Sequence, residues 1–477
     1  MVASRINPAH WTRRRFLGAA LIAGTAALIP PGLAASPRRL VVIGAGLAGL
    51  ASARLLETLG HDVVVLEARD RVGGRVHTLF DTPGNPEAGA NTIGPNYGRT
   101  VAAAERHDLA LLPQGRGAPP GLIVDGQVID RADWVNAELN DLPTAIRSVT
   151  PDRLGFALLG DHPLDRSTSW LEARHSDADL SAAEFFRAQG LSERALGWIE
   201  ANNSYGNRLA DTSLLALQAT AAGIGRAMAW GQPALETEGG NQRIPNAMAA
   251  ALESAVVLNS PVVEIIQRGS EVSVVTADGR RHPADAVICT LPLPLLARLK
   301  IQPAPAVRFA EALAAVAYHK VSQLHLLARQ AYWEDEDQPA SWWTNGPLGR
   351  VFTRSRPNAA GSHNITVWIN GDACDAIDHL SEEQATATLL AEFERQIPGS
   401  RGQVEVAALV RWATDPYNRG AWALWPPGRI ADLVPTLSQP HDRLFFAGEH
   451  TGQSYSGMEA ALESAERAVL EALRRLQ

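Results

Sequence analysis

The stretch from Arg39 to Gly49 constrains the fold of this chain more than any other segment. An apolar run, Leu40 to Ile43, leads into Gly44-Ala45-Gly46-Leu47-Ala48-Gly49, and a second apolar run ends at Glu67. This spacing predicts a strand, a tight glycine turn, a helix and a second strand that ends in an acid. Such a unit binds a dinucleotide, with the pyrophosphate at the helix N-terminus and the acid on the ribose hydroxyls.

The three glycines of the turn are predicted to have separate roles. Gly44 allows the tight turn, Gly46 lets the backbone approach the pyrophosphate, and Gly49 lets the helix pack on the strand. An ordinary glycine turn in a parallel sheet is the alternative. The apolar run before the turn, and the acid about twenty residues later, favour nucleotide binding.

The residues after Glu67 indicate which dinucleotide is bound. Ala68-Arg69-Asp70-Arg71-Val72-Gly73-Gly74-Arg75 follows without a break. Together with the glycine turn, this segment resembles the flavin amine oxidase family, which includes monoamine and polyamine oxidases. The resemblance implies FAD rather than NAD. It also implies that the pyrophosphate and the flavin are lined by Arg69, Gly73, Gly74 and Arg75.

The same resemblance implies cofactor contacts far from the turn. Val262, in the first strand of a later block, would touch adenine, although core packing explains this valine equally well. Glu449, in Gly448-Glu449-His450-Thr451, would contact the ribityl-phosphate region. The backbone amide of Met458, at a predicted helix N-terminus, would face the flavin pyrimidine. Some relatives carry a cysteine bonded to the flavin where this chain has Ala421, so we expect non-covalent FAD.

Three residues are implied to act on the substrate. Lys320 begins a predicted strand that precedes Tyr332-Trp333, and it would hold a water beside flavin N5. On sequence alone this lysine would be read as a surface residue, since lysine is rarely buried. Trp422 would form one wall of an aromatic cage for the amine, and Tyr455 is our choice for the opposite wall.

The fold class expected is α/β: a two-domain, Rossmann-like FAD-binding flavoprotein with a discontinuous α+β substrate domain. The predicted boundaries place 38–91, 238–293 and 414–477 in the FAD-binding domain. The substrate-binding domain takes 92–237 and 294–413. A length of 477 residues suits two domains better than one.

The first 35 residues are predicted to be a targeting segment rather than part of the fold. Thr12-Arg13-Arg14-Arg15-Phe16-Leu17 resembles a twin-arginine export signal, and small and apolar residues follow. Gly18 to Ile29 is too short for a stable membrane span, although a retained anchor is the alternative. Export of the folded protein by the twin-arginine machinery would place the mature chain in the periplasm or outside the cell.

Composition excludes some other classes. The formal net charge of −8 argues against nucleic-acid binding. The two cysteines, Cys289 and Cys374, lack metal-ligand spacing, and no metal site is expected.

The reaction implied is oxidation of an amine carbon–nitrogen bond by hydride transfer to flavin N5. The resulting imine hydrolyses to an aldehyde or ketone, and O2, giving H2O2, or a periplasmic redox protein accepts the electrons. An L-amino-acid oxidase would need a cation for the substrate carboxylate. The segment from Gly89 to Gly94 contains no such cation, so we expect amines to be preferred over amino acids. Arg99 follows this segment closely in the chain and keeps the amino-acid alternative open. A flavin desaturase and a non-catalytic flavin-binding protein are further alternatives.

Overall fold

The structure is a computed structural model that describes residues 36–477, except 116, 161, 163, 202, 336, 337, 355 and 455. The predicted targeting segment and Tyr455 therefore lie outside the described residues. In the part of the chain that is described, no helix is both long enough and apolar enough to cross a membrane.

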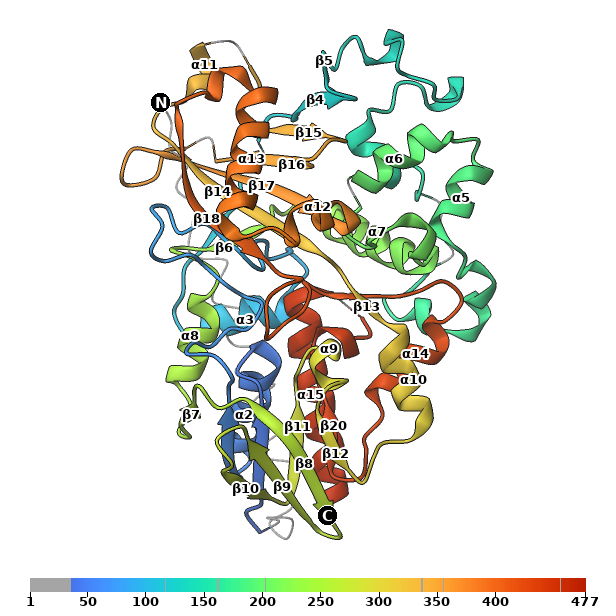
Figure 1. The fold of residues 1–477 in the computed structure, drawn as a ribbon. Helices are drawn as coiled ribbons and strands as arrows, with labels where there is room; N and C mark the ends of the chain where they lie inside the picture. Colours follow the sequence, from blue (N-terminus) through green and yellow to red (C-terminus); the bar gives the residue numbers. More distant parts are fainter. Residues whose placement is uncertain are drawn as a thin grey trace, which may run out of the picture.

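The first domain is built on a five-stranded parallel sheet with the order β20-β11-β1-β2-β7, in the lower half of Figure 1. Helices α2 and α15 pack on one face, where Leu50 and Val469 belong to the same core. The predicted strand, glycine turn, helix and strand are thus confirmed. The bounds are β1 (Arg39–Ile43), α2 (Leu47–Thr58), β2 (Asp62–Leu66), β7 (Val256–Val257), β11 (Ala286–Cys289), β20 (Leu444–Phe446) and α15 (Gly457–Leu476).

A second, four-stranded sheet with the order β10-β9-β8-β12 packs on the other face. The strand expected at Val262 is confirmed as β8, and β9 pairs with it. The bounds here are β8 (Val262–Arg268), β9 (Glu271–Thr276), β10 (Arg281–Ala284), β12 (Lys300–Gln302), α8 (Arg243–Ala250), α9 (Leu293–Leu296), α10 (Val307–Ala315) and α14 (Ile430–Ser438).

The second domain contains a seven-stranded sheet with the order β18-β14-β17-β16-β15-β4-β5, in the upper half of Figure 1. Strands β4 and β5 come from the first segment predicted for the substrate-binding domain, 92–237, and the other strands come from the second, 294–413. The strands are β4 (Gly121–Val124), β5 (Gln127–Ile129), β14 (Val321–Ala328), β15 (Trp342–Thr344), β16 (Arg350–Thr353), β17 (His363–Asn370) and β18 (Val404–Arg411).

Helices cover this sheet unequally. Helix α13 packs on one face, where Leu389 and Phe393 meet Leu324 and Val367. Helix α7 begins after Ser213, whose side chain accepts from the Ala216 N–H and caps the helix N-terminus. The bounds are α4 (Leu154–Ala157), α5 (Ala182–Ala188), α6 (Glu193–Ala201), α7 (Leu214–Ala229), α11 (Tyr332–Asp335), α12 (Asp375–Asp378) and α13 (Glu382–Gln396). Two short strand pairs complete the described strands: β3 (Leu111–Pro113) with β6 (Leu235–Thr237), and β13 (Ala317–Tyr318) with β19 (Ala423–Leu424).

The domain boundaries differ from the predicted ones at two places. Helix α3 (Gly98–Arg106), expected in the substrate domain, packs against α15, with Ala103 and Ala104 in the first domain's core. Strand β12 and helix α10 also belong to the first domain, because β12 pairs with β8 and Phe309 packs in the same core. The nucleotide-type domain therefore extends beyond residues 91 and 293.

Candidate active site

The glycine turn after β1 has the geometry that a pyrophosphate needs. Gly44 has a φ of +99°, which favours glycine, and its N–H donates to the Leu66 carbonyl over 2.8 Å. A Cβ on Gly49 would lie 1.9 Å from the Gly44 carbonyl oxygen, so only glycine allows α2 to pack this closely. A Cβ on Gly46 would meet only the Gly73 carbonyl oxygen, at 4.0 Å. The backbone is thus open to a ligand at Gly46, at the N-terminus of α2.

Glu67 lies at the end of β2 beside this turn. The residue is 7% exposed, and its Oε2 accepts from the Ala45 N–H over 2.8 Å. Its Oε1 accepts from the Arg69 N–H over 2.9 Å. Because a carboxylate has about four acceptor positions, lone pairs remain for ribose hydroxyls. The predicted role of Glu67 fits this geometry.

Gly73, Gly74 and Arg75 approach the same turn from the other side. The Gly73 N–H donates to the Ala45 carbonyl over 2.9 Å, and Gly73 forms a bridge with Gly46. A Cβ on Gly74 would meet the Cα of Gly46 at 3.6 Å. The glycine pair and the glycine turn therefore lie against each other, although α2 and β2 separate them in the chain.

Arg75, from the N-terminal part of the chain, binds residues from its C-terminal part. Its Nη1 donates to Glu449 Oε2 over 3.0 Å and to the Ala421 carbonyl over 2.8 Å. Burial alone would lower the pKa of Arg75, but the Glu449 carboxylate raises it above its ordinary value. Burial raises the pKa of Glu449, against the effect of Arg75. Arg75 is thus a fixed cation, held by the two segments that were predicted to close the cofactor site.

The remaining cofactor candidates differ in how well their positions suit contact with a cofactor. The guanidinium of Arg69 pairs with Asp415 and lies over the Tyr417 ring, so a protein carboxylate already occupies it. Val262 is partly buried in the second core, and the Ser260 N–H donates to the Glu67 carbonyl over 2.7 Å, which brings this segment to the acid. Met458 is the second residue of α15 and is buried, so its backbone N–H is one of those at the helix N-terminus without an intrahelical partner.

Trp422 lies directly beside the Arg75–Glu449 pair. Its neighbour Ala421 accepts from Arg75, and the Ala423 N–H reaches Glu449 Oε2 over 3.5 Å. The indole stacks on His319 with ring centroids 4.8 Å apart. Its Nε1 donates to the Ser204 carbonyl over 2.8 Å. The structure thus brings Trp422 together with the predicted flavin-contacting residues.

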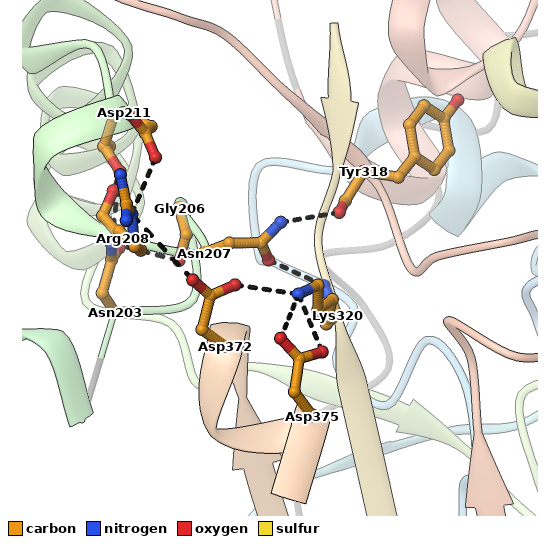
Figure 2. A network of polar contacts seen from close by, with 10 residues as sticks. Asn203, Gly206, Asn207, Arg208, Asp211, Tyr318, Lys320, Asp372 and Asp375 are labelled. Atoms are coloured by element: carbon orange, nitrogen blue, oxygen red, sulfur yellow. Dashed lines mark hydrogen bonds and ion pairs between the residues drawn. The ribbon is translucent and has the colours of Figure 1, made fainter. Parts of the chain in front are cut away.

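Lys320 is placed differently from what we expected. Its ammonium donates to Asp372 over 2.9 Å and to Asp375 over 2.7 and 2.8 Å, as Figure 2 shows. Side chains alternate along a strand, and Ser322, on the same side as Lys320, bonds Asp378 of α12. The structure therefore gives Lys320 two carboxylate partners on the α12 side and does not bring it to Trp422. A role beside flavin N5 stays a prediction that this geometry does not support.

The opposite side of β14 carries residues that the sequence analysis did not single out. Gln323 lies opposite Trp368 of β17, and Trp368 lies opposite Arg350 of β16. Trp368 packs in one cluster with Val321, Ala421 and Trp422. The alternation of side chains along the strand could have revealed this side. Ser322, Leu324 and Leu326 face α12 and α13, so Val321, Gln323 and His325 lie on the opposite side.

Comparison with known proteins identifies the family. The flavin containing amine oxidoreductase model matches residues 47–473. The chain belongs to this family. It is 28% identical to an L-amino-acid oxidase of Mus musculus over 91% of this chain and 70% of that protein. It is 25% identical to polyamine oxidase 4 of Oryza sativa subsp. japonica over 89% of this chain and 86% of that protein.

Solved structures share the fold. A putrescine oxidase bound to putrescine superposes with a TM-score of 0.75 at 21% identity, over 92% of this chain and 99% of that one. A cyclohexylamine oxidase from Brevibacterium oxydans IH-35A gives a TM-score of 0.75 at 19% identity, with the same coverage. The predicted two-domain flavoprotein fold is confirmed, and the protein is an FAD-dependent amine oxidase.

The residues present fit FAD. The turn is open at Gly46, the Glu67 carboxylate is positioned for ribose, and Arg75 is fixed where a flavin and its phosphates would approach. When bound, the flavin accepts a hydride from the carbon that bears the nitrogen.

Proposed function

We propose that this enzyme binds FAD without a covalent bond and oxidises a small-molecule amine that lies against Trp422. The observation that carries the proposal is the position of Trp422 between Ala421 and Ala423, the two residues that contact the Arg75–Glu449 pair. An aromatic face so close to the flavin-binding residues attracts an amine nitrogen and excludes water. Product imine then hydrolyses to an aldehyde or ketone.

Three parts of the proposal concern the setting of the reaction. Ala421 stands where some relatives attach the flavin, which supports non-covalent FAD; acid precipitation should release all of the flavin from the polypeptide. O2 is the proposed acceptor, with a redox protein as the alternative.

The segment around Arg13-Arg14 supports export to the periplasm by the twin-arginine machinery. Replacing both arginines with lysine should keep the enzyme in the cytoplasm.

Substitution of Trp422 tests the proposal. Trp422→Ala should lower kcat/KM for amines by about 10–100-fold, the cost of truncating a buried aromatic anchor. FAD content, measured by absorbance of the purified holoenzyme, should stay within about twofold, because the Arg75–Glu449 pair is held by backbone atoms of residues 421 and 423. Trp422→Phe, which keeps an aromatic face, should recover most of the activity.

The matched control is Trp230→Ala, since Trp230 is 62% exposed. This variant should behave like the unmodified enzyme in both measurements. An anaerobic screen of monoamines, diamines and amino acids, followed by bleaching of the oxidised flavin band, would identify the substrates. Equal bleaching rates for Trp422→Ala and the unmodified enzyme would overturn the position proposed for the amine.

A further inference from the structure

One face of the seven-stranded sheet is polar and aromatic, although Gln323 and Trp368 on it are buried. Gln323, Trp368 and Arg350 lie in register on β14, β17 and β16, and each is the direct cross-strand neighbour of the next. Adjacent strands are about 4.8 Å apart, so Arg350 lies about 10 Å across the sheet from Gln323. The other face of the same strands is apolar and packs under α13.

Arg350 is a cation on this face without a carboxylate partner among the described residues. Its guanidinium lies 5.8 Å from the Trp368 ring centre and 5.7 Å from that of Phe352. Its Nη2 donates to the Ser204 hydroxyl over 2.6 Å, while its Nε is buried and has no hydrogen-bond acceptor in the described chain. A guanidinium has five N–H donors, so most of its hydrogen-bonding capacity is free.

Burial changes the acid–base behaviour of this side chain. It lowers the pKa of Arg350 to about 10, and the only titratable group opposing that effect among those described is Tyr205. Arg350 is partly exposed, but a desolvated cation without an anion is still costly, and proteins usually pair it. The two aromatic rings and Ser204 hold the guanidinium in place but do not neutralise it. An anion that binds here would find a preorganised site.

Ser204 connects this cation to the proposed amine site. Its hydroxyl accepts from Arg350, and its carbonyl accepts from Trp422 Nε1. The field of Arg350 also reaches His319, whose ring stacks on Trp422. Ser204 therefore contacts both Arg350 and the tryptophan beside the flavin-binding residues.

We propose that Arg350 binds a carboxylate of the substrate, so that the enzyme oxidises amino acids in preference to amines without an acid group. The proposal rests on the function proposed above and names its substrate class. It reverses the expectation drawn from Gly89 to Gly94, because the cation comes from a different strand. Arg99, the other candidate, is occupied: its guanidinium binds Glu459 and Glu466.

The planar fork of a guanidinium matches a carboxylate. The acid could be the α-carboxylate or one farther from the nitrogen, and matched substrate pairs separate these. Phenylalanine and phenethylamine differ by an α-carboxylate. 4-Aminobutyrate and butylamine differ by a distal one. The unmodified holoenzyme should prefer the acid in at least one pair, in anaerobic flavin reduction.

The variant Arg350→Met should lower kcat/KM for the preferred acid by about 100-fold and change that for the matched amine by only a few fold. Arg350→Lys, which keeps the charge but not the fork, should fall between. Arg354→Met is the matched control, because Arg354 follows the same strand but is exposed and paired with Glu236. It should retain the preference.

Benzoate provides a second readout that needs no turnover. It should perturb the flavin spectrum of the holoenzyme, and Arg350→Met should weaken its binding by about 100-fold, while benzyl alcohol should bind both equally weakly. Equal losses for acid and amine in Arg350→Met, or unchanged benzoate binding, would overturn the proposal. If no amine or amino acid reduces the flavin, the proposed function fails, and the benzoate titration still decides the role of Arg350.

Discussion

Lys320, next to the start of β14, and Arg350, on β16, are two cations of the substrate domain with β17 between their strands, and their surroundings are opposite. Lys320 lies on the α12 side of the sheet, between Asp372 and Asp375. Arg350 lies on the Trp422 side, between two aromatic rings, and no described carboxylate is paired with it. One cation is satisfied by the protein. The other has capacity left for a ligand.

The pKa directions express the same difference. Partial burial would lower the pKa of Lys320, but the hydrogen bonds that it donates to Asp375 and Asp372 raise the pKa above its ordinary value. Burial lowers the pKa of Arg350 to about 10, since no acid compensates for it. A perturbed cation whose partner is absent from the protein is a better candidate for substrate binding than one that the protein has already paired.

Giving Arg350 a protein partner should remove the difference. Ser204→Asp would place a carboxylate where the hydroxyl now accepts from Arg350. An internal carboxylate competes with that of the substrate, so kcat/KM for the preferred amino acid should fall by about 100-fold or more. The loss for the matched amine should be much smaller. Steady-state kinetics with phenylalanine and phenethylamine measures both.

Ser204→Asn is the control for this experiment, because it has the size of aspartate without the charge. It should lose no more than about tenfold with either substrate, the value of one hydrogen bond. If Asn and Asp at this position have the same effect on the amino acid, then shape rather than charge governs the site.

His319 tests whether the Arg350 side can accept another positive charge. Burial, with a smaller contribution from Arg350, lowers the pKa of His319 to about 3. The unfolded chain binds a proton near pH 6.5, whereas the folded chain does not. Stability from this group is therefore fully present above pH 6.5 and is lost as the pH falls toward 3, by up to about 1.4 kcal/mol per pH unit.

The measurement is the free energy of unfolding of the holoenzyme at pH 7 and pH 5. His319→Asn should show a smaller loss between these values than the unmodified enzyme. His325 and His450 are also buried, with pKa values lowered to about 4 and about 3, so part of the acid sensitivity should remain. Identical pH profiles for His319→Asn and the unmodified enzyme would show that the fold does not lower the pKa of His319.

The sequence could predict the nucleotide half of the site because local geometry dictates it. The turn at Gly44 needs a positive φ, the approach of α2 needs Gly49, and Glu67 follows a strand. These requirements involve residues close in the chain, so they leave a readable pattern. Arg75 and Glu449 were found because their motifs are specific, although the contact between them is long-range.

The substrate half could not be predicted in the same way. Lys320 was expected at the start of a strand, and the strand begins at Val321. A shift of one residue changes the face on which a side chain lies, and the sequence does not show which face meets Trp422. An arginine is normally read as a surface residue. Arg350 differs only because Ser204 and Trp368, from distant segments, enclose it.

Lys320→Met is the smallest expected effect and tests the other side of the comparison. Removing the ammonium leaves Asp372 and Asp375 facing each other at a partly exposed position. The free energy of unfolding should fall by about 0.5–1 kcal/mol at pH 7, as for other exposed ion pairs. Because Lys320 lies on the α12 side, stopped-flow reoxidation of the reduced flavin should keep its rate within about twofold.

The stability that Lys320 contributes through its acidic partners depends on pH, and a second substitution should restore part of it. Since the folded-state pKa of Lys320 is raised, its contribution is fully present below the ordinary lysine pKa of 10.5 and is lost as the pH rises through the folded value. Adding Asp375→Asn to Lys320→Met should restore part of the stability by removing the repulsion between the two acids. A large loss in the reoxidation rate, with stability unchanged, would instead place the Lys320 ammonium beside the flavin in the holoenzyme. Lys320, as well as Arg350, would then contact a molecule that takes part in the reaction.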